Sequence, residues 1–380
     1  MPAKYTSDAQ LLKSFQYFNN RKLKKKVENS CLLFVTFKYF AGNIKSMRAY
    51  QINEFGIEKL TLAELEKPEP KSNEVLIKIH AASLNYRDLM MVKGTYNPKL
   101  QMPIIPFSDG AGEVVAIGEK VAKWKIGDRV CPIFMQGWTD GAIEISKART
   151  ALGGDLDGCL REFAAFDENG LVKIPDLLSY EEAATLPCAA VTAYNALFCS
   201  GSLKPDDSVL LQGTGGVSIF ALQLASMYGS RAIVISSSDE KLERAKELGA
   251  DNLINYKETP DWDKQVLELT EKRGVDHVVE VGGAGTLQKS LNAVKMGGHI
   301  AVIGALSGAG AVNPVSILMK TVRLQGIFVG SRLMFEALNR MISEHHLKPV
   351  IDKVYEFDEA REALKYMESA AHFGKIVVKI

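Results

Sequence analysis

The sequence has few cysteines and no long apolar run. It holds five cysteines among 380 residues, at irregular spacing and without a Cys-x-x-Cys pair. This scarcity argues against a disulfide framework and indicates a reducing compartment, so we expect a cytoplasmic protein. No run reaches the roughly 18 apolar residues of a membrane-spanning helix, so we also expect no membrane association.

The chain carries little net charge, and that charge is unevenly distributed. The formal net charge is +1 at pH 7. Residues 1–46 hold nine lysines and arginines against two acidic residues, so acidic residues outnumber basic ones in the remainder. The body of the chain therefore lacks the basic excess of a nucleic-acid-binding protein. The whole chain has 47% hydrophobic and 24% charged residues, which is ordinary for a soluble protein, and its length suits two domains.

The first 46 residues differ in character from the rest. They contain a charge run, RKLKKKVE, and a short apolar stretch, CLLFVTF. They lack the order of regions found in a signal peptide, and their single arginine argues against a transit peptide. A clean strand pattern begins at Met47. We therefore interpret Met47 as the native start and residues 1–46 as a non-native extension or a disordered tail, which N-terminal mass analysis of protein from its natural host tests.

The most informative stretch is VLLQGTGGVSIFALQLA, residues 209–225. An apolar strand pattern ends in a turn with Gly213, Gly215 and Gly216, and apolar residues at helical spacing follow. A strand, a glycine turn and a helix open a dinucleotide-binding unit, because the glycines let the backbone approach a pyrophosphate and the helix N-terminus attracts it. The third glycine of the G-x-G-x-x-G fingerprint is absent, so a glycine-rich loop of another α/β protein is the alternative.

The next strand pattern, RAIVIS at residues 231–236, bears on the choice of cofactor. In a site that prefers NAD, an acidic residue near its end would bind the ribose hydroxyls. Here Ser236 and Ser237 follow, with Lys241 just beyond. Small hydroxyls and a nearby cation suit a 2′-phosphate, which predicts NADPH as the cofactor. The alternative is that Ser237 and Glu240 only form a capping box for the next helix; both hold if Ser236 and Lys241 face the cofactor.

Two patterns divide the chain. The first part is β-rich, with short strands predicted over residues 74–85, 105–118, 124–133 and 159–167. From residue 179 strands alternate with helices, and strands are predicted over 208–213, 231–236, 252–256, 275–281, 299–304 and 323–329. This alternation predicts a parallel, doubly wound sheet and an α/β fold class. The tail has helices predicted over 333–345 and 358–370 and strands in VIDKVYEF and GKIVVKI, which return to the first domain.

These features together resemble the medium-chain dehydrogenase/reductase superfamily, and within it the zinc-lacking quinone oxidoreductase-like branch beside the zinc-type alcohol dehydrogenase-like proteins. The resemblance covers residues 47–380 and rests on LNYRDLMMVKGTY (84–96), SDGAGEVVAIGEKV (108–121), GDRV (127–130), EEAATLPCAAVTAYNAL (181–197), QGTGGVS (212–218) and HFGKIVV (372–378). It implies a β-rich GroES-like catalytic domain over 47–178 with 336–380, and a Rossmann-type dinucleotide-binding domain over 179–335.

The sequence departs from the zinc alcohol dehydrogenases of this superfamily. Those enzymes hold a catalytic metal with a Cys, a His beside a Glu, and a later Cys or Asp. By resemblance these positions correspond to Asn85, to Ser108 with Asp109, and to Cys188. One thiolate and no imidazole cannot form the usual three-ligand zinc site, and the six histidines follow no ligand pattern, so we expect no metal. Cys188 is then a small buried apolar residue rather than a ligand or a nucleophile.

Without zinc, a hydrogen-bond donor or general acid must stabilise the charge that develops as hydride arrives. The resemblance implies Tyr96 in this role, the alternative being a packed loop aromatic. Asn85, at a former ligand position, is the candidate for orienting the substrate. Asp88 is expected to cap a turn or helix and to pair with Arg87.

The resemblance also implies a set of cofactor-binding residues. It implies Thr192 near the nicotinamide, Gly213, Gly215, Gly216 and Val217 at the pyrophosphate, and Ser236, Ser237 and Lys241 at the 2′-phosphate. Tyr256 matches a tyrosine on the phosphate side, with a strand-end aromatic as the alternative. Gly282, Ile303 and Val329 end successive strands along the crevice where such ligands lie. Lys375 is expected to reach the cofactor, with a solvated lysine as the alternative.

The sequence therefore predicts a zinc-independent, NADPH-dependent oxidoreductase that transfers hydride to a carbonyl, a quinone or an activated alkene. A zinc-type alcohol dehydrogenase and a non-catalytic NADPH-binding protein are the alternatives. Mostly apolar and aromatic residues over 94–100, 132–141 and 330–338 favour a small hydrophobic substrate. The resemblance implies a homodimer whose sheets pair edge to edge near the strand over 299–304.

Overall fold

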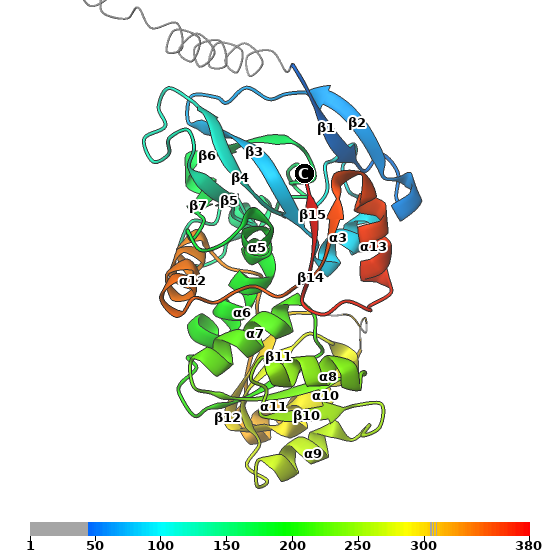
Figure 1. Ribbon diagram of the computed structural model, residues 1–380. Coiled ribbons are helices and arrows are strands. Elements are labelled where there is room, and N and C mark those ends of the chain that lie inside the picture. The colour runs from blue at the N-terminus through cyan, green and yellow to red at the C-terminus, as the bar shows by residue number, and fades with distance from the viewer. Residues whose placement is uncertain (1–44, 305, 307, 309) are drawn as a thin grey trace, which may run out of the picture. The chain divides into compact units, whose positions relative to one another are not determined.

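Two sheets hold most of the strands in the residues that the computed structural model describes, which are 45–304, 306, 308 and 310–380. Both sheets belong to one body, residues 48–380 (Figure 1). Of residues 1–46, interpreted as an extension or a disordered tail, residues 1–44 lie outside the described residues, and Ser46 begins β1.

The first sheet is mixed and mostly antiparallel. Its strand order is β14-β15-β3-β4-β5-β7, and β6 pairs with β3. The strands are β3 (Glu74–Ser83), β4 (Asp109–Ile117), β5 (Arg129–Pro132), β6 (Phe163–Asp167), β7 (Leu171–Lys173), β14 (Ile351–Glu356) and β15 (Lys375–Lys379). Only β14 and β15 pair in parallel. A separate two-stranded sheet joins β1 (Ser46–Gln51) and β2 (Thr61–Glu66). The predicted β-rich first part and the returning tail are both present.

The second sheet is parallel throughout. Its six described strands follow the order β10-β9-β8-β11-β12-β13. They are β8 (Ser208–Gln212), β9 (Arg231–Ser236), β10 (Asn252–Asn255), β11 (Val275–Glu280), β12 (Val294–Val302) and β13 (Arg323–Gly326). This order is that of a Rossmann-type sheet, in which the direction of winding reverses between β8 and β11. The predicted doubly wound parallel sheet is confirmed.

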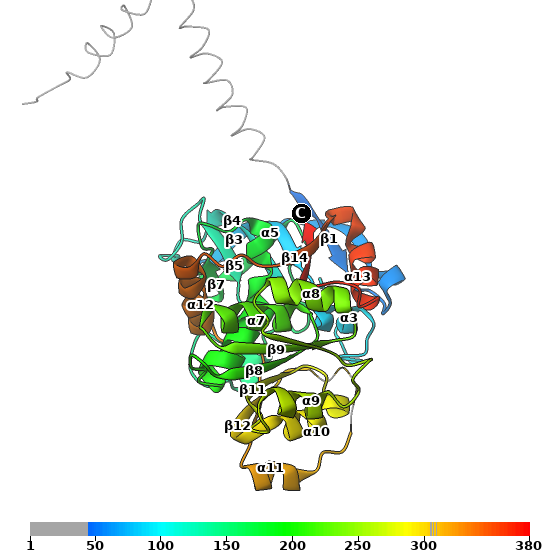
Figure 2. The ribbon, with the colours of Figure 1, turned by 60° about the horizontal axis from the view of Figure 1, so that its bottom comes forward.

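Helices cover both faces of the parallel sheet (Figures 1 and 2). On one face, residues of α7 (Gly216–Met227) and α8 (Asp239–Glu247) share a buried apolar cluster with Val209 and Leu211 of β8. On the other face, residues of α9 (Trp262–Leu269) and α10 (Ala284–Ala293) share a second cluster with Leu210. Successive side chains of a strand point to opposite faces, so a strand that is covered on both sides is apolar throughout, as VLL is here.

The remaining helices connect the sheets and the tail. Before the parallel sheet come α3 (Tyr86–Val92), α4 (Ile145–Ala148), α5 (Tyr180–Ala184), α6 (Val191–Tyr194) and two π-helical segments, η4 (Leu186–Ala190) and η5 (Asn195–Ser200). After it come α12 (Arg332–His345) and α13 (Ala360–Glu368). Short 3₁₀ turns are η2 (Ile57–Lys59), η3 (Glu168–Gly170) and η6 (Phe357–Glu359). The helix α11 (Pro314–Lys320), between β12 and β13, was not among the predicted elements. The proposed boundaries at 178/179 and 335/336 stay predictions.

The outer strand of the parallel sheet is β13, and its four residues are exposed. The strand predicted over 299–304 overlaps the end of β12 and is not an edge, because β13 pairs with it through residues such as Arg323 beside His299. Leu318 and Met319 of the neighbouring α11 are also exposed. The homodimer stays a prediction, now centred on β13, and a molar mass of one chain in solution would contradict it.

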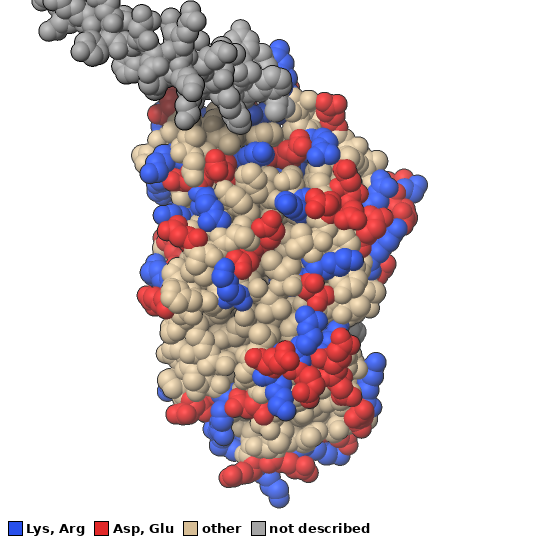
Figure 3. Space-filling view, viewed as in Figure 1, with Lys and Arg blue, Asp and Glu red and all other residues tan. Residues whose placement is uncertain are grey.

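Charged side chains of both signs lie on the face of the molecule that Figure 3 shows. On the face in Figure 3, lysine and arginine are interspersed with aspartate and glutamate. Among the described residues, no helix is both long enough and apolar enough to cross a membrane.

Two buried histidines, His277 of β11 and His299 of β12, make stability depend on pH. Burial lowers the pKa of both side chains, that of His299 to about 4. The folded state therefore binds fewer protons than the unfolded state, whose histidines titrate near 6.5, so stability is lost as the pH falls from about 6.5 towards 4. We predict that His299→Gln weakens the dependence of the free energy of unfolding on pH, as measured by urea unfolding. The glutamine can keep the contact with Ser200 (2.9 Å). His345→Gln, at an exposed position, is the control. The same slope of the free energy of unfolding against pH in wild type and His299→Gln would contradict the prediction.

Candidate functional site

The glycine turn after β8 has the conformation that its sequence predicts. Gly213 adopts φ +70°, which favours glycine, and its N–H donates to the carbonyl of Ile235 on β9 (2.7 Å). Gly216 begins α7, and a Cβ atom there would lie 2.6 Å from Cδ of Lys375. The turn thus brings a helix N-terminus to the carboxyl end of the sheet, where backbone N–H groups can bind an anion.

The C-terminal strand closes against this turn. Gly374 donates its N–H to the carbonyl of Thr214 (2.9 Å), and Gly215 and Gly374 form a parallel bridge. The next residue begins β15, which pairs with β3 of the first sheet. One short segment of the tail therefore joins the glycine turn to the first sheet.

The other predicted cofactor residues lie at the carboxyl ends of the parallel strands. Ser236 ends β9, and its carbonyl accepts the N–H of Tyr256 (3.0 Å), which follows β10. Gly282 and Ile303 follow β11 and β12, and the N–H of Ile303 donates to the carbonyl of Glu280 (2.8 Å). Neighbouring parallel strands bring these positions to one edge of the sheet, as their spacing predicts.

Val329 follows β13, and Thr192 lies on α6. Val329 is buried and adopts φ +56°, a strained conformation for a β-branched residue. Its carbonyl accepts a hydrogen bond from Nδ2 of Asn195 (2.8 Å), which holds the strained backbone in place. Thr192 is buried on α6, while Val217 is part-buried in the first turn of α7.

The capping box of Ser237 and Glu240, the alternative considered for the start of α8, does not form. The N-cap is Ser238, whose side chain accepts the N–H of Lys241, so Ser237 is not the cap. The Lys241 ammonium donates to the carbonyl of Ala370 (2.7 Å), and burial lowers the pKa of this lysine. Ser237 is therefore available for another role, and Lys241 lies against the tail segment that leads to β15.

Lys375 lies in a buried polar cluster, so the solvated alternative is wrong. We define this cluster as Asn85, Ser108, Asp109, Cys188 and Lys375. Nζ of Lys375 donates to the carbonyl of Leu84 and to Oδ1 of Asn85 (2.6 Å). Nδ2 of Asn85 donates to Ser108 (3.2 Å), whose hydroxyl donates to Asp109 (2.8 Å). The N–H of Cys188, in η4, donates to the other oxygen of Asp109 (3.0 Å). The donors run in one direction, from an ammonium to a carboxylate.

Burial perturbs the titration of every ionisable group in this cluster. Burial lowers the pKa of Lys375, although the nearby Asp109 opposes that shift. Burial also raises the pKa of Asp109, against the influence of Lys375 and of the hydrogen bonds from its neighbours. The pKa of the Cys188 thiol is raised by burial, so Cys188 is a thiol and not a reactive thiolate near neutral pH. Cys188 is only part-buried and packs against the apolar core, so the predicted full burial is not found, while an unreactive thiol agrees with the prediction.

Asp88 completes the capping box of α3, whose N-cap is Asn85. Its carboxylate accepts the N–H of Asn85 (2.8 Å) and the N–H of Ser108 (3.3 Å). Burial raises its pKa to about 6, while the nearby Arg87 opposes the shift, with 3.9 Å between the two charged groups. Asp88 thus fixes the backbone of Asn85 and Ser108, two members of the buried polar cluster.

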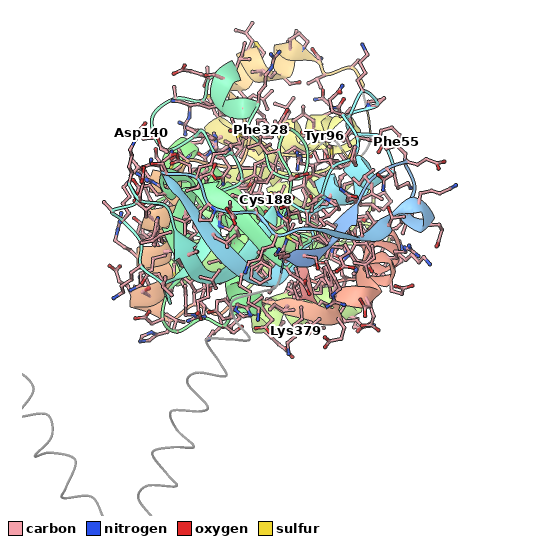
Figure 4. All side chains as sticks on the ribbon, turned by 90° about the horizontal axis from the view of Figure 1, so that it is seen from above. Phe55, Tyr96, Asp140, Cys188, Phe328 and Lys379 are labelled. Carbon is pink, nitrogen blue, oxygen red and sulfur yellow. The ribbon has the colours of Figure 1, made fainter. Side chains whose placement is uncertain are left out.

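Tyr96 is held by a cation and not by the buried polar cluster. It is 46% exposed, and the guanidinium of Arg87 lies 5.4 Å from its ring centroid. The same guanidinium lies 4.9 Å from the Phe134 ring, which contacts Phe328 edge-on at 6.2 Å. Tyr96 and Phe328 are both labelled with Cys188 in Figure 4. Arg87 donates to the carbonyl of Leu152 (2.9 Å), which fixes the middle of this stack.

Sequence reasoning missed several residues of the site. Phe328 follows β13 and lies two residues before the segment 330–338, whose composition was taken to favour a hydrophobic substrate. Glu280 and Gln212, both buried at strand ends beside the glycine turn, were also missed. A buried acid at the end of the otherwise apolar run VVEV was the available signal for Glu280.

Two family models match this chain. The model described as "Alcohol dehydrogenase GroES-like domain" matches residues 71–176, and the one described as "Zinc-binding dehydrogenase" matches residues 216–344. They fall on the first sheet and on the parallel sheet, respectively. A β-rich GroES-like domain combined with a Rossmann-like domain defines the class of dehydrogenases and reductases that use a nicotinamide cofactor.

Relatives and solved structures agree with this class. A zinc-type alcohol dehydrogenase-like protein of Schizosaccharomyces pombe is 45% identical over 333 residues, which cover 86% of this chain and 96% of the relative. Human quinone oxidoreductase is 30% identical over 84% of this chain and 93% of its own length. The crystal structure of a putative alcohol dehydrogenase from Sinorhizobium meliloti 1021 matches with a TM-score of 0.84 at 41% identity, covering 89% of this chain and 100% of that one.

This chain belongs to the medium-chain dehydrogenase/reductase superfamily, and it is an NAD(P)H-dependent oxidoreductase. The predicted family, fold class and enzyme class are confirmed.

Proposed function

We propose that this protein is a zinc-independent, NADPH-dependent reductase that transfers hydride to a carbonyl, a quinone or an activated alkene of a small hydrophobic molecule. The observation that carries this proposal is the Lys375 ammonium, which is bonded to the Asn85 carbonyl oxygen at the centre of the buried polar cluster. By the resemblance, Asn85 matches a metal-ligand position of the zinc alcohol dehydrogenases, so a cation of the chain itself bonded to it supports a site without zinc.

The donor set of the buried polar cluster does not fit a catalytic zinc ion. Zinc takes thiolate, imidazole or carboxylate ligands, and its catalytic sites use three of them. Here the Asn85 oxygen accepts from Lys375, both Asp109 oxygens accept hydrogen bonds, and burial raises the pKa of the Cys188 thiol. Among the described residues, no group of three or more His, Cys, Asp or Glu side chains could hold a metal ion.

Tyr96 is our candidate for the proton donor. A bound nicotinamide supplies the hydride, and the substrate oxygen or the neighbouring carbon then needs a proton. The exposed Tyr96 phenol is available to a substrate, and stacking on Arg87 limits its motion. Phe328, which packs edge-on against the buried Phe134, is exposed and offers apolar surface, which supports a hydrophobic substrate. Nδ2 of Asn85 carries a second N–H, which we assign to orienting the substrate.

The preference for NADPH is supported by the end of β9. Ser236 and Ser237 stand where a site that prefers NAD carries an acidic residue. The neighbouring Lys241 ammonium has a neutral carbonyl as its hydrogen-bond partner. An anion bound beside it would therefore gain a charge-assisted hydrogen bond without first breaking an ion pair with this lysine.

Lys241→Ala tests the assignment of the 2′-phosphate site. We expect NADPH affinity to fall about tenfold while NADH affinity changes less than threefold, because only NADPH carries the phosphate that Lys241 would bind. Calorimetric titration with both nucleotides measures this. Lys246→Ala, at an exposed position on the same helix α8, is the matched control. Equal weakening of both nucleotides by Lys241→Ala would count against the assignment.

Tyr96→Phe tests the proton donor. The change removes one hydroxyl and keeps the ring on Arg87, so we expect turnover to fall at least about tenfold with little change in NADPH affinity. Tyr86→Phe is the control, since Tyr86 is a similarly exposed tyrosine, on the nearby helix α3. Steady-state rates and nucleotide binding are measured for both variants. Turnover that survives in Tyr96→Phe would remove Tyr96 from the chemistry.

The function itself is tested with chelator-treated protein. NADPH oxidation is followed with 1,4-benzoquinone, 9,10-phenanthrenequinone, trans-2-enals and simple aldehydes, and metal content is measured in parallel. We expect turnover with at least one of these substrates that is unchanged by chelation. Stoichiometric zinc and a rate that needs it would favour the zinc-type alcohol dehydrogenase instead. NADPH binding without any turnover would favour the non-catalytic alternative.

A further inference from the structure

Glu280 is a fully buried carboxylate at the end of β11 that has no part in the chemistry proposed above. One of its oxygens accepts from the N–H groups of Gly282 (2.9 Å) and Gly283 (3.0 Å) and from the Thr286 hydroxyl. The other accepts from Nε2 of Gln212 (2.6 Å) and from the Ser290 hydroxyl. A buried carboxylate is tolerated only when its desolvation is offset in this way, so each of these donors is held firmly in place.

Gln212 has only one orientation that satisfies its neighbours. It is buried at the end of β8, directly before Gly213. Its Nε2 donates to Glu280, and its Oε1 accepts from the N–H groups of Val281 (3.3 Å) and Gly282 (3.2 Å). If the amide were flipped, its oxygen would face the Glu280 carboxylate, and its NH₂ group would face the N–H groups of Val281 and Gly282. Gln212 and Glu280 therefore form a link of fixed polarity between β8 and β11.

This link lies where the winding of the sheet reverses. Strands β8 and β11 are neighbours, and the chain leaves them in opposite directions along the sheet. The glycine turn, residues 213–216, follows Gln212, and the loop 281–283 follows Glu280. In a Rossmann-type sheet a dinucleotide lies across the crevice between these two connections. The link thus joins the two loops that would contact the pyrophosphate and the nicotinamide sides of the cofactor.

We propose that Glu280 is a positioning residue that, through Gln212, fixes the separation of the glycine turn and the loop 281–283 and thereby sets the affinity for the dinucleotide. The proposal rests on the dinucleotide binding of the proposed function, but not on NADPH rather than NADH, on Tyr96 or on the absence of zinc. Glu280 itself touches neither cofactor nor substrate in this role.

Single substitutions break the polarity of the link. Glu280→Gln has nearly the same shape, but its NH₂ group would face either the Gln212 NH₂ group or the N–H groups of the loop 281–283. Gln212→Glu would place two carboxylates against each other. We expect each variant to weaken binding of the preferred nucleotide at least about tenfold, because unsatisfied buried groups shift the loops that carry them.

The exchanged pair, Gln212→Glu with Glu280→Gln, restores the polarity. The new Glu at 212 accepts from the new amide at 280 and from the N–H groups of Val281 and Gly282. The new Gln at 280 offers its oxygen to Gly282, Gly283 and Thr286, and the Ser290 hydroxyl can rotate to match. We expect nucleotide affinity to return to within about threefold of wild type, which a role in stability alone does not require.

Asp276→Asn supplies the matched control. Asp276 is also a buried acid of β11, but it lies at the strand's other end and contacts Arg273 (2.8 Å), Lys295 and Ser208. Its loss should lower the melting temperature and leave nucleotide affinity unchanged. Calorimetric titration with NADPH and NADH, thermal unfolding, and hydrogen exchange of the amides at 213–216 and 281–283 are measured for all variants.

The result that supports the proposal is weaker binding and faster exchange at both loops in each single variant, with recovery of both in the exchanged pair. Wild-type affinity in Glu280→Gln would overturn it and leave the proposed function intact. A loss of affinity that merely follows the loss of thermal stability, as judged against Asp276→Asn, would also overturn it. Wild-type protein that binds neither nucleotide would overturn the proposed function and this inference together.

Discussion

The contact of the tail with both sheets is the constraint on which the site depends. Gly374 is bonded to Thr214 in the glycine turn, and Lys375 is bonded to Asn85 beside the first sheet. The aliphatic part of Lys375 passes so close to Gly216 that a Cβ atom there would clash. A single dipeptide therefore fixes the turn that would bind the cofactor relative to the residue that would face the substrate. Hydride transfer needs that kind of fixed geometry, because reacting atoms must approach within about 3–3.5 Å.

The buried Lys375 ammonium at this junction is stabilised by hydrogen-bond acceptors that face it. Lys375 donates to two oxygens, and the chain of donors through Asn85 and Ser108 ends on Asp109. Because burial disfavours both charged ends, each end needs the opposite charge at the other, as the opposing influences on the pKa values of Lys375 and Asp109 indicate. The cluster is therefore complete without a further cation. Under the proposed zinc-independent function, a metal would have to displace Lys375 from Asn85.

The sequence predicted what depends on local pattern. The glycine turn, the parallel strands and the position of Ser236 follow from periodicity and spacing. The N-cap of α8 is Ser238 and not Ser237, because both serines are good N-cap residues and local sequence does not choose between them. The burial of Lys375 was not predictable in this way, since it follows from the pairing of β15 with β3, about 290 residues earlier in the chain. The same holds for Arg87, whose partners Tyr96, Phe134 and Leu152 come from separate loops. Long-range pairing decides which polar side chain is buried, and residue type alone does not.

Glu280 and Asp276, two buried acids of one strand, have different roles. Asp276 stabilises the sheet, and Glu280 positions the loops at the crevice. Both are buried acids of β11, yet Asp276 has charged partners, whose influence lowers its pKa, and Glu280 has neutral donors. An ion pair at the start of the strand holds the sheet together and is remote from the crevice. A carboxylate at the strand's end that binds loop N–H groups fixes backbone at the crevice itself. In a parallel sheet only the carboxyl ends border the ligand. The same side-chain chemistry therefore acts on stability at one end of β11 and on the shape of the cofactor crevice at the other.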